Sequence, residues 1–159
     1  MSKRIITLGT WNGKPIDWLI LSEDNFSTLV ISRFEIGRMY FNGSSSNNNW
    51  DSSDLRKFLN NCFYETAFNE DEKKKIVNTK LTDANNCKDD VFILSEKELK
   101  ALLDDDDEYE SKYYRSCSYC VWTRTKDGNS VRHGYAGGCW CSHSASNSYA
   151  VRPAMYLKK

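Results

Sequence analysis

The sequence lacks a net charge, a long apolar run and all but two histidines. Its 22 basic residues balance 22 acidic residues, so charge gives no reason to expect binding to nucleic acid or to an anionic membrane. The apolar runs are no longer than a strand, which excludes a bilayer-spanning helix and predicts no membrane insertion. The opening MSKRIITLG has neither an h-region nor a cleavage site. We therefore expect no secretory signal, reduced cysteines, and a location in the cytoplasm or in a phage particle.

Catalytic signatures are missing too. The chain contains no G-x-S-x-G, no H-E-x-x-H and no glycine-rich phosphate loop, and both histidines fall in the last third. We therefore expect a protein that is not an enzyme and that has no cofactor.

Strand-like segments stand at both ends of the chain. Residues 5–8 and 16–21 predict two strands joined at Asn12-Gly13, a strong tight-turn signal, and residues 28–32 predict a third. This opening indicates an antiparallel meander. In the last third, turns rich in Gly and Ser separate strands that we expect at residues 121–125, 131–135 and 150–157.

Helical patterns occupy the middle of the chain. One apolar stripe with helical spacing consists of Leu55, Phe58, Leu59, Cys62 and Phe63. Ser52 or Ser53 can cap this helix. A short charged helix is expected over residues 70–76, and a buried strand is expected over residues 90–94.

A further helix is predicted by a capping box, in which Ser95 is followed three residues later by Glu98. This helix should continue to Leu103. The order of elements is therefore strands, then two or three helices, then strands again. That order indicates one α+β domain over residues 1–159.

Cysteine and histidine gather in the last third, where Cys117, Cys120, Cys139, Cys141, His133 and His143 lie. A zinc ribbon prefers two C-x-x-C knuckles in glycine-containing turns, whereas the second pair here is C-x-C and the first leads straight into the strand-like VWTRT. A redox C-x-x-C usually opens a helix, but residues 113–125 have no helical period. A metal- or thiol-dependent enzyme or metalloprotein built on this cluster stays an alternative, as do an ordinary surface loop and a small interaction domain with a fixed partner.

The composition of residues 133–151 favours a binding surface. Lys, Glu and Gln disappear between His133 and Val151, while Cys, Trp, Tyr, His, Ser and Asn crowd together. Solvated loops are usually rich in the charged types that are missing. Paratopes favour Tyr, Ser, Asn, Gly and occasional Trp, because rigid rings and small adaptable donors bind well.

Five segments occur in the same order in a bacterial domain family that the chain resembles: WNGKPIDWLIL, NNNWDSSDLRKFLNNCFYETAF, DDVFILSEKE, VWTRT and AVRPAMYL. The most specific parts are Trp50, Leu55, Arg56, Leu59 and Asn60, and the run Val151-Arg152-Pro153-Ala154. That family is similar to C-type lectin-like domains of the formylglycine-generating-enzyme type. The resemblance implies an α+β, C-type lectin-like fold with mixed or antiparallel small sheets, two or three helices, and late loops that form a ligand surface. It also implies that residues 4–8 and 152–157, the N- and C-terminal strands, pair with each other.

Two departures limit this resemblance. The W-L-R-S segment of the family is Trp122-Thr-Arg-Thr here, and the cysteines that bind copper in formylglycine-generating enzymes match no specific pair in this chain. No catalytic residue and no metal ligand is therefore carried over. Arg152 is expected to be structural and to bond loop carbonyls beneath the surface.

Similar C-type lectin-like domains are the variable proteins of diversity-generating retroelements, in which replacement of adenines diversifies codons near the 3′ end. All residues from 133 to 149 except Trp140 belong to the set that such replacement produces from Asn codons, so Trp140 would be a fixed anchor. The implied variable region covers about residues 113–150. The resemblance implies a non-catalytic module that binds an unknown protein or other macromolecular ligand through Cys117, Tyr119, His133, Tyr135, Trp140, Ser142, His143, Ser144, Ser146, Asn147 and Tyr149.

Overall fold

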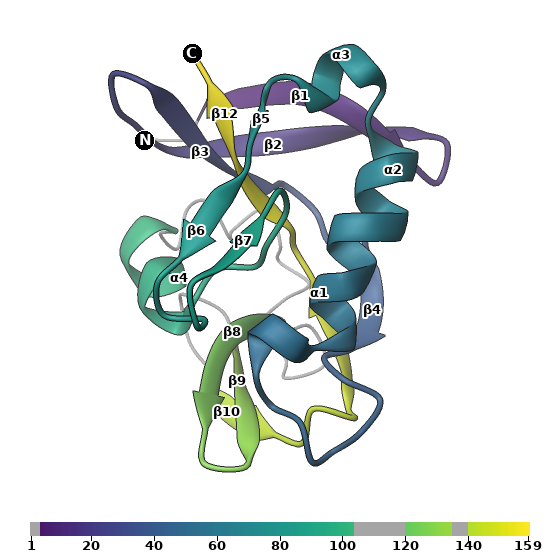
Figure 1. The fold of residues 1–159 in the computed structure, drawn as a ribbon, viewed down its shortest axis with the longest axis vertical. Helices are drawn as coiled ribbons and strands as arrows, with labels where there is room; N and C mark the ends of the chain where they lie inside the picture. Colours follow the sequence, from purple (N-terminus) through teal and green to yellow (C-terminus); the bar gives the residue numbers. More distant parts are fainter. Residues whose placement is uncertain (1–3, 104–119, 135–139) are drawn as a thin grey trace.

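Two five-stranded sheets, one above the other, form the frame of the molecule (Figure 1). The computed structural model describes residues 4–103, 120–134 and 140–159. The upper sheet has the order β1-β2-β3-β12-β5, and all its pairs are antiparallel. Its strands are β1 (Ile5–Trp11), β2 (Lys14–Glu23), β3 (Ser27–Ser32), β5 (Ile76–Val77) and β12 (Ala154–Lys158).

The lower sheet has the order β10-β9-β8-β11-β4. Its pairs are antiparallel except β8 with β11, which run parallel. Its strands are β4 (Gly37–Tyr40), β8 (Val121–Asp127), β9 (Ser130–Gly134), β10 (Cys141–His143) and β11 (Ser148–Val151). A separate hairpin joins β6 (Thr79–Leu81) to β7 (Cys87–Asp89).

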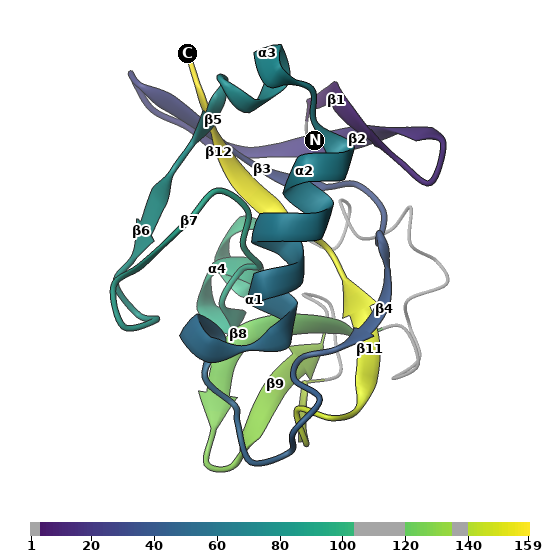
Figure 2. The same cartoon turned by 45° about the vertical axis from the view of Figure 1, so that its right-hand side comes forward.

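A helical column runs beside both sheets, as Figures 1 and 2 show. It consists of a 3-10 turn (Trp50–Ser52), α1 (Asp54–Phe58), a π-helical turn (Leu59–Phe63) and α2 (Tyr64–Ala67). Two shorter helices follow, α3 (Glu70–Lys73) and α4 (Glu96–Leu102). The structure is therefore a mixed α+β fold, with mostly antiparallel sheets and few helices, as the sequence predicts.

The local helix signals are confirmed. Ser53 is the cap of α1, where its side chain accepts a hydrogen bond from the Arg56 amide. Ser95 and Glu98 make both hydrogen bonds of the predicted capping box. The charged helix is shorter than expected, because Ile76 already belongs to β5.

The apolar stripe of the column differs in part from the prediction. The buried positions are Leu55, Leu59, Phe63 and Ala67, each four residues after the last, whereas Cys62 is exposed and Phe58 is only half-buried. The π turn accounts for the difference, since it has more residues per turn than an α-helix and a spacing of four then stays on one face.

The prediction that the N- and C-terminal strands pair with each other is wrong. β1 and β12 lie in the same sheet, but β2 and β3 separate them. The tight turn at Asn12 and Gly13, both with positive φ, folds β1 onto β2 and leaves β1 at the edge. The outer edge of β3 is then the place where β12 pairs.

The single strand expected over residues 150–157 is in fact two strands in different sheets. β11 ends at Val151 and β12 begins at Ala154, and the chain passes from the lower sheet to the upper sheet at Arg152-Pro153. Pro153 cannot donate to a ladder. Arg152 is buried and donates from Nε to the carbonyl of Ser32 over 2.9 Å. Its role is structural as expected, but the acceptor is the last residue of β3 and not a loop carbonyl.

Of the segment 90–94, residues 91–94 are buried as predicted and Asp90 is partly exposed. The segment forms no strand apart from an isolated bridge between Phe92 and Ala154. Side chains satisfy the backbone instead. Asn60 accepts from the amides of Asp90 and Val91 and donates to the carbonyl of Val91. Arg124 donates from Nη1 to the carbonyl of Ile93.

One cluster of buried apolar residues connects the column with both sheets. It includes Trp18, Val30 and Met155 of the upper sheet and Trp122 and Val131 of the lower sheet. Among the described residues, no helix is long and apolar enough to cross a membrane.

Candidate functional site

The predicted contact residues that the structure describes lie on β9, β10 and β11, in the turn between β10 and β11, and, for Trp140, directly before β10. Cys117, Tyr119 and Tyr135 lie outside the described residues. We use the name C-terminal face for the members with at least partial exposure on β10 and around it: Trp140, Ser142, His143, Ser144, Ser146 and Asn147.

Trp140, directly before β10, and Ser142, on β10, contact side chains of α4 and of the neighbouring strands. The ammonium group of Lys100 lies 4.7 Å from the centroid of the Trp140 ring. The hydroxyl of Ser142 accepts from Nη1 of Arg132 over 3.1 Å and donates to Asp127 over 2.7 Å. The half-buried indole of Trp140, with the ammonium group of Lys100 over its ring, therefore lies near the hydroxyl group of Ser142.

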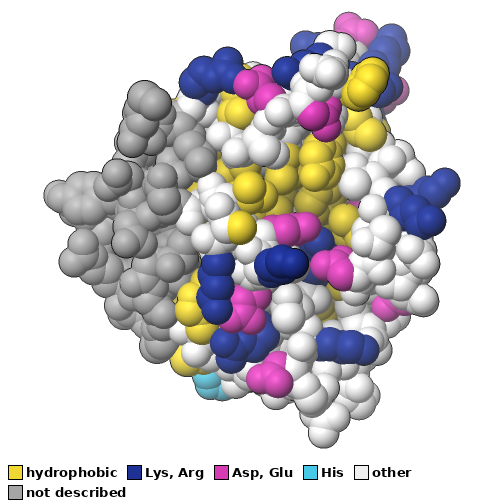
Figure 3. Space-filling model, turned by 90° about the vertical axis from the view of Figure 1, so that its left-hand side faces the viewer, with side chains coloured by type: hydrophobic (Ala, Val, Ile, Leu, Met, Phe, Trp, Pro, Cys, Tyr) yellow, Lys and Arg dark blue, Asp and Glu magenta, His cyan; other side chains and the backbone are white. Residues whose placement is uncertain are grey.

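Glu96 of α4 connects this part of the C-terminal face to the helix. It accepts hydrogen bonds from the guanidinium of Arg132 at 3.0 Å through both carboxylate oxygens, and Lys100 donates to it over 2.7 Å. The hydrogen bonds from Arg132 are the main reason that the pKa of Glu96 falls to about 2. Figure 3 shows the alternation of Lys or Arg with Asp or Glu on this side of the molecule, below a band of hydrophobic side chains.

A shallow hollow of about 490 Å³ lies over α4 on the same side. Its lining residues are Glu96, Lys97, Lys100, Ala101 and Thr125. Because Lys100 also covers Trp140, the hollow extends the C-terminal face towards the helix.

His133 and Tyr149 belong to an inner aromatic cluster. The two rings stack with centroids 3.9 Å apart, and Trp122 meets both edge-on. His133 is fully buried, so its side chain is not part of any surface, contrary to its prediction as a ligand contact. Tyr149 is half-buried.

The two histidines meet at the edge of this cluster. His133 Nε2 and His143 Nδ1 are 2.6 Å apart, a hydrogen bond whose direction depends on the tautomers. Burial lowers the pKa of His133 to about 4, and the nearby charges of His143 and Arg132 act in the same direction. His133 is therefore neutral at physiological pH.

Strand alternation divides the predicted contacts between two sides. Ser142 hydrogen-bonds to Arg132 and Asp127 on the outer side, whereas its neighbour His143 stacks on His133 on the inner side. Successive residues of a strand point to opposite faces of the sheet. The C-terminal face is thus the rim of an edge strand and not one flat surface.

The turn that follows β10 connects this rim to a loop from far earlier in the chain. Ser144 and Ser146 hydrogen-bond through their hydroxyls over 2.9 Å, and Asn147 is exposed. Ala145 between them is buried, and its carbonyl accepts from the amide of Asn42 over 3.0 Å. The turn therefore has a buried anchor and polar, accessible side chains.

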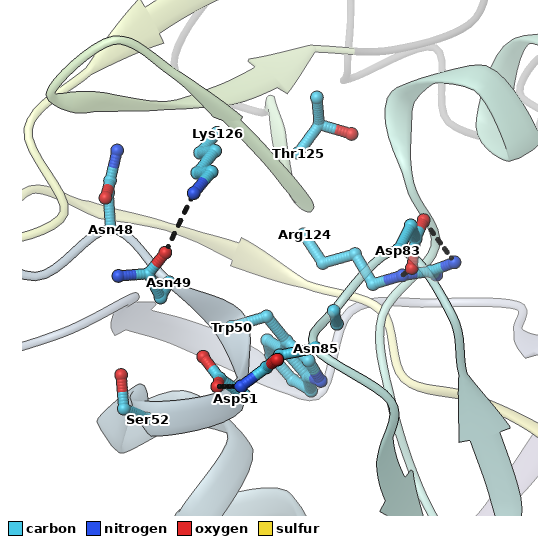
Figure 4. A pocket seen from close by; sticks show the side chains of 11 residues that line it. Asn48, Asn49, Trp50, Asp51, Ser52, Asp83, Asn85, Arg124, Thr125 and Lys126 are labelled. Carbon is cyan, nitrogen blue, oxygen red and sulfur yellow. Dashed lines mark hydrogen bonds and ion pairs between the residues drawn. The ribbon is translucent and has the colours of Figure 1, made fainter.

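A second, more polar hollow of about 610 Å³ was not predicted from the sequence as a site. It lies between the 3-10 turn, the β6–β7 hairpin and β8 (Figure 4). The lining residues are Asn48, Asn49, Trp50, Asp51, Ser52, Asp83, Ala84, Asn85, Arg124, Thr125 and Lys126. The one signal in the sequence was the polar run FNGSSSNNNWDSS, which predicts a loop but not what faces it.

The ionic groups of this polar hollow fall into two kinds. Arg124 is buried and its guanidinium is saturated by the carboxylates of Asp83 and Glu98, at 2.7–3.0 Å. Lys126 and Asp51 make no ion pair within the described part of the chain. Lys126 donates to Asn49 over 3.1 Å, and Asp51 accepts from Asn85 over 3.0 Å.

The described residues contain no group of three or more His, Cys, Asp or Glu side chains that could hold a metal ion. Cys120 is buried and Cys141 is half-buried. Cys117 and Cys139, the other members of the suspected cluster, lie outside the described residues.

Comparison with protein-family models matches residues 17–159 to DUF6273, a domain of unknown function. No curated protein and no solved structure matches the chain.

Proposed function

The chain belongs to the DUF6273 family, and we propose that it is a non-catalytic module that binds a protein ligand through its C-terminal face. The observation that supports this proposal is the separation of accessible from buried side chains around β10. Its accessible side chains are short or amphipathic, whereas the neighbouring positions Val131, Ala145, Ala150 and Val151 are buried. Residue types on the face can therefore change while the core stays intact.

The chemistry of the face suits protein recognition. Trp140 supplies a large amphipathic ring, the kind of side chain that dominates binding energy at interfaces. Around it stand the hydroxyls of Ser142, Ser144 and Ser146 and the amide of Asn147, which can adapt their hydrogen bonds to different partners. The inner aromatic cluster, in which the rings of His133 and Tyr149 stack, supports these residues from the inner side of the sheet.

We further propose a C-type lectin-like scaffold whose C-terminal face is diversified, as in the variable proteins of diversity-generating retroelements. The α+β composition and the position of the late turn support this assignment, whereas the separation of β1 from β12 counts against it. The coding DNA gives a direct test. We expect a nearby imperfect copy of the last third that differs at adenines, beside a reverse transcriptase gene, and its absence would remove the retroelement assignment.

A display experiment tests the binding function itself. Codons 142, 143, 144, 146 and 147 are randomised with Trp140 kept, and the library is selected against lysozyme as a model protein ligand. The matched control library randomises five exposed positions away from the face: Lys57, Glu65, Glu70, Asp71 and Lys80. We expect specific binders from the first library at unchanged melting temperature. Equal yields from both libraries, or unfolding of the face variants, would contradict the proposal.

The rival function, a metalloprotein or thiol-dependent enzyme, is favoured by one observation. Cys141 lies directly opposite His133 in the ladder, and His133 contacts His143. Elemental analysis of the purified protein separates the two functions. We expect no stoichiometric zinc or copper; a stoichiometric metal that is lost in Cys141→Ser and in His143→Ala would favour the rival.

A further inference from the structure

Two opposite charges that make no ion pair with a described residue, those of Lys126 and Asp51, line the polar hollow. Figure 4 shows the Lys126 side chain directed at Asn49, and Asp51 hydrogen-bonded to Asn85. Neither charge makes an ion pair within the described residues, whereas Arg124 in the same hollow is bound by two carboxylates. The charge of Arg56, which is not a lining residue, also acts on Asp51. Unlike Arg124, these two groups keep hydrogen-bonding capacity for a ligand.

The side-chain amides of Asn49 and Asn85 have the same hydrogen-bonding character as the charged groups that they contact. Asn49 uses its Oδ1 to accept from Lys126, which leaves its Nδ2 donor beside the ammonium group. Asn85 uses its Nδ2 to donate to Asp51, which leaves its Oδ1 acceptor beside the carboxylate. Of these four groups, Lys126 and Asn49 therefore present donors, and Asp51 and Asn85 present acceptors.

The framework of the hollow is held rigid by contacts over long distances in the sequence. Asn48 donates to the carbonyls of Gly128 and Ser130, which fixes the 3-10 turn against the β8–β9 hairpin. Trp50 is buried and donates to Asp89, which fixes the same turn against β7. A volume of about 610 Å³ is within the ordinary range of small-molecule sites.

The geometry points to a second binding site, in which the polar hollow takes a small zwitterion: a free amino acid or a short peptide with both ends charged. Its carboxylate would lie against Lys126 and the Asn49 amide, and its ammonium group against Asp51 and the Asn85 carbonyl. Charge-assisted hydrogen bonds of this kind are stronger than neutral ones. The lining of this site includes no residue of the C-terminal face. The site goes beyond the proposed function, because it needs no diversified residue.

A series of probes tests the assignment by calorimetry or by chemical-shift titration on the whole chain. Glycine, glycylglycine and triglycine differ in the separation of their charged ends, and we expect one of them to bind best. N-acetylation removes the ammonium group and C-terminal amidation removes the carboxylate, and each should weaken the best binder about tenfold or more. These blocked probes test the unaltered protein, so the result does not depend on a variant that folds.

Two substitutions then assign the ends. Lys126→Gln should weaken binding of the intact probe about tenfold and leave binding of the amidated probe, which has no carboxylate, unchanged. Asp51→Asn should weaken binding of the intact probe about tenfold and leave binding of the acetylated probe, which has no ammonium group, unchanged. Lys57→Gln and Asp71→Asn are matched controls on exposed charges outside the hollow and should change nothing. If Lys126→Gln weakens the amidated probe as much as the intact one, or Asp51→Asn weakens the acetylated probe as much as the intact one, the assignment of the two ends is wrong.

Two further outcomes also decide against a zwitterion site. Methyl glucoside, a neutral polyol, should not compete; if it binds as well as the best oligoglycine, the hollow recognises hydroxyl groups. If no member of the series binds with a Kd below about 10 mM, Lys126 and Asp51 are solvated surface charges and the hollow is not a site for such ligands.

Discussion

Trp50 donates its indole N–H to the carboxylate of Asp89 over 2.8 Å, and both side chains are buried. The Nε of Arg56 donates to the other oxygen of the same carboxylate. Asn60, one helical turn further on, holds the backbone of Asp90 and Val91. The residues Trp50, Arg56 and Asn60, among the most specific parts of the family resemblance, thus attach the helical column to the end of β7 and to the segment that follows it.

Removal of the Asp89 carboxylate should be costly. In Asp89→Ala the Trp50 N–H and the Arg56 guanidinium lose their common acceptor, so we expect the free energy of unfolding to fall by about 3 kcal/mol. Urea unfolding measures the change. The matched control is Asp90→Ala, one position along and partly exposed, for which we expect about 0.5 kcal/mol. Similar losses for both would show that the buried network contributes little.

The helical column and the C-terminal face should respond oppositely to truncation. Leu59→Ala creates a cavity in the core and should cost about 2–5 kcal/mol, while Phe58→Ala should cost less, since its ring is only half-buried. Ser142→Ala and Asn147→Ala should each change stability by about half a kcal/mol. Thermal melts of this panel check the order. If the face variants unfold the domain, these residues are structural and the proposed variable surface fails.

Glycine at position 9 should be required for packing, not only for its φ of +76°. A Cβ there would lie 2.7 Å from the Phe68 ring and 2.8 Å from the Ala67 carbonyl, so Gly9→Ala should cost more than about 2 kcal/mol. Gly13 has the same φ but nothing within 4 Å, so Gly13→Ala should cost only the conformational strain, about 1 kcal/mol. Equal melting temperatures for the two variants would contradict this reading of the packing at β1.

The stability of the protein should fall in mild acid because of His133. Its pKa of about 4 in the folded protein lies below the ordinary value of 6.5, so between these limits the unfolded chain binds a proton that the folded chain does not. Neutral His133 therefore makes its full contribution to the free energy of unfolding above pH 6.5. As the pH falls to 4, this contribution is lost, and the free energy of unfolding falls by up to about 3 kcal/mol. We expect His133→Phe, which keeps a ring to stack on Tyr149, to flatten this part of the stability profile.

Glu96 separates this effect from general acid unfolding. Its lowered pKa of about 2 stabilises the folded state above its ordinary value of 4.5, and that contribution disappears between pH 4.5 and 2. Chemical unfolding at a series of pH values should therefore show His133→Phe diverging from the unaltered protein above pH 4. A difference confined to lower pH would assign the effect to carboxylates instead.

Features decided within a few residues could be predicted from the sequence. The hairpin at Asn12-Gly13, the cap at Ser53 and the capping box of Ser95 with Glu98 all appear where the local pattern placed them. Each depends on the backbone preference of a residue or on hydrogen bonds that reach only three positions along the chain. The α+β class follows in the same way from the order of such elements.

The partners of each element were decided only in three dimensions. Residues 90–94 have the composition of a buried strand, yet Asn60 and Arg124 take the hydrogen bonds that a neighbouring strand would otherwise make. The polar hollow depends on Lys126 meeting Asn49, 77 positions earlier, and the rim of β10 depends on Asn42 meeting Ala145. A sequence pattern predicts which face of an element is apolar. Which distant residues come together depends on how all these apolar faces pack into one dense core, and this is determined only in the tertiary structure.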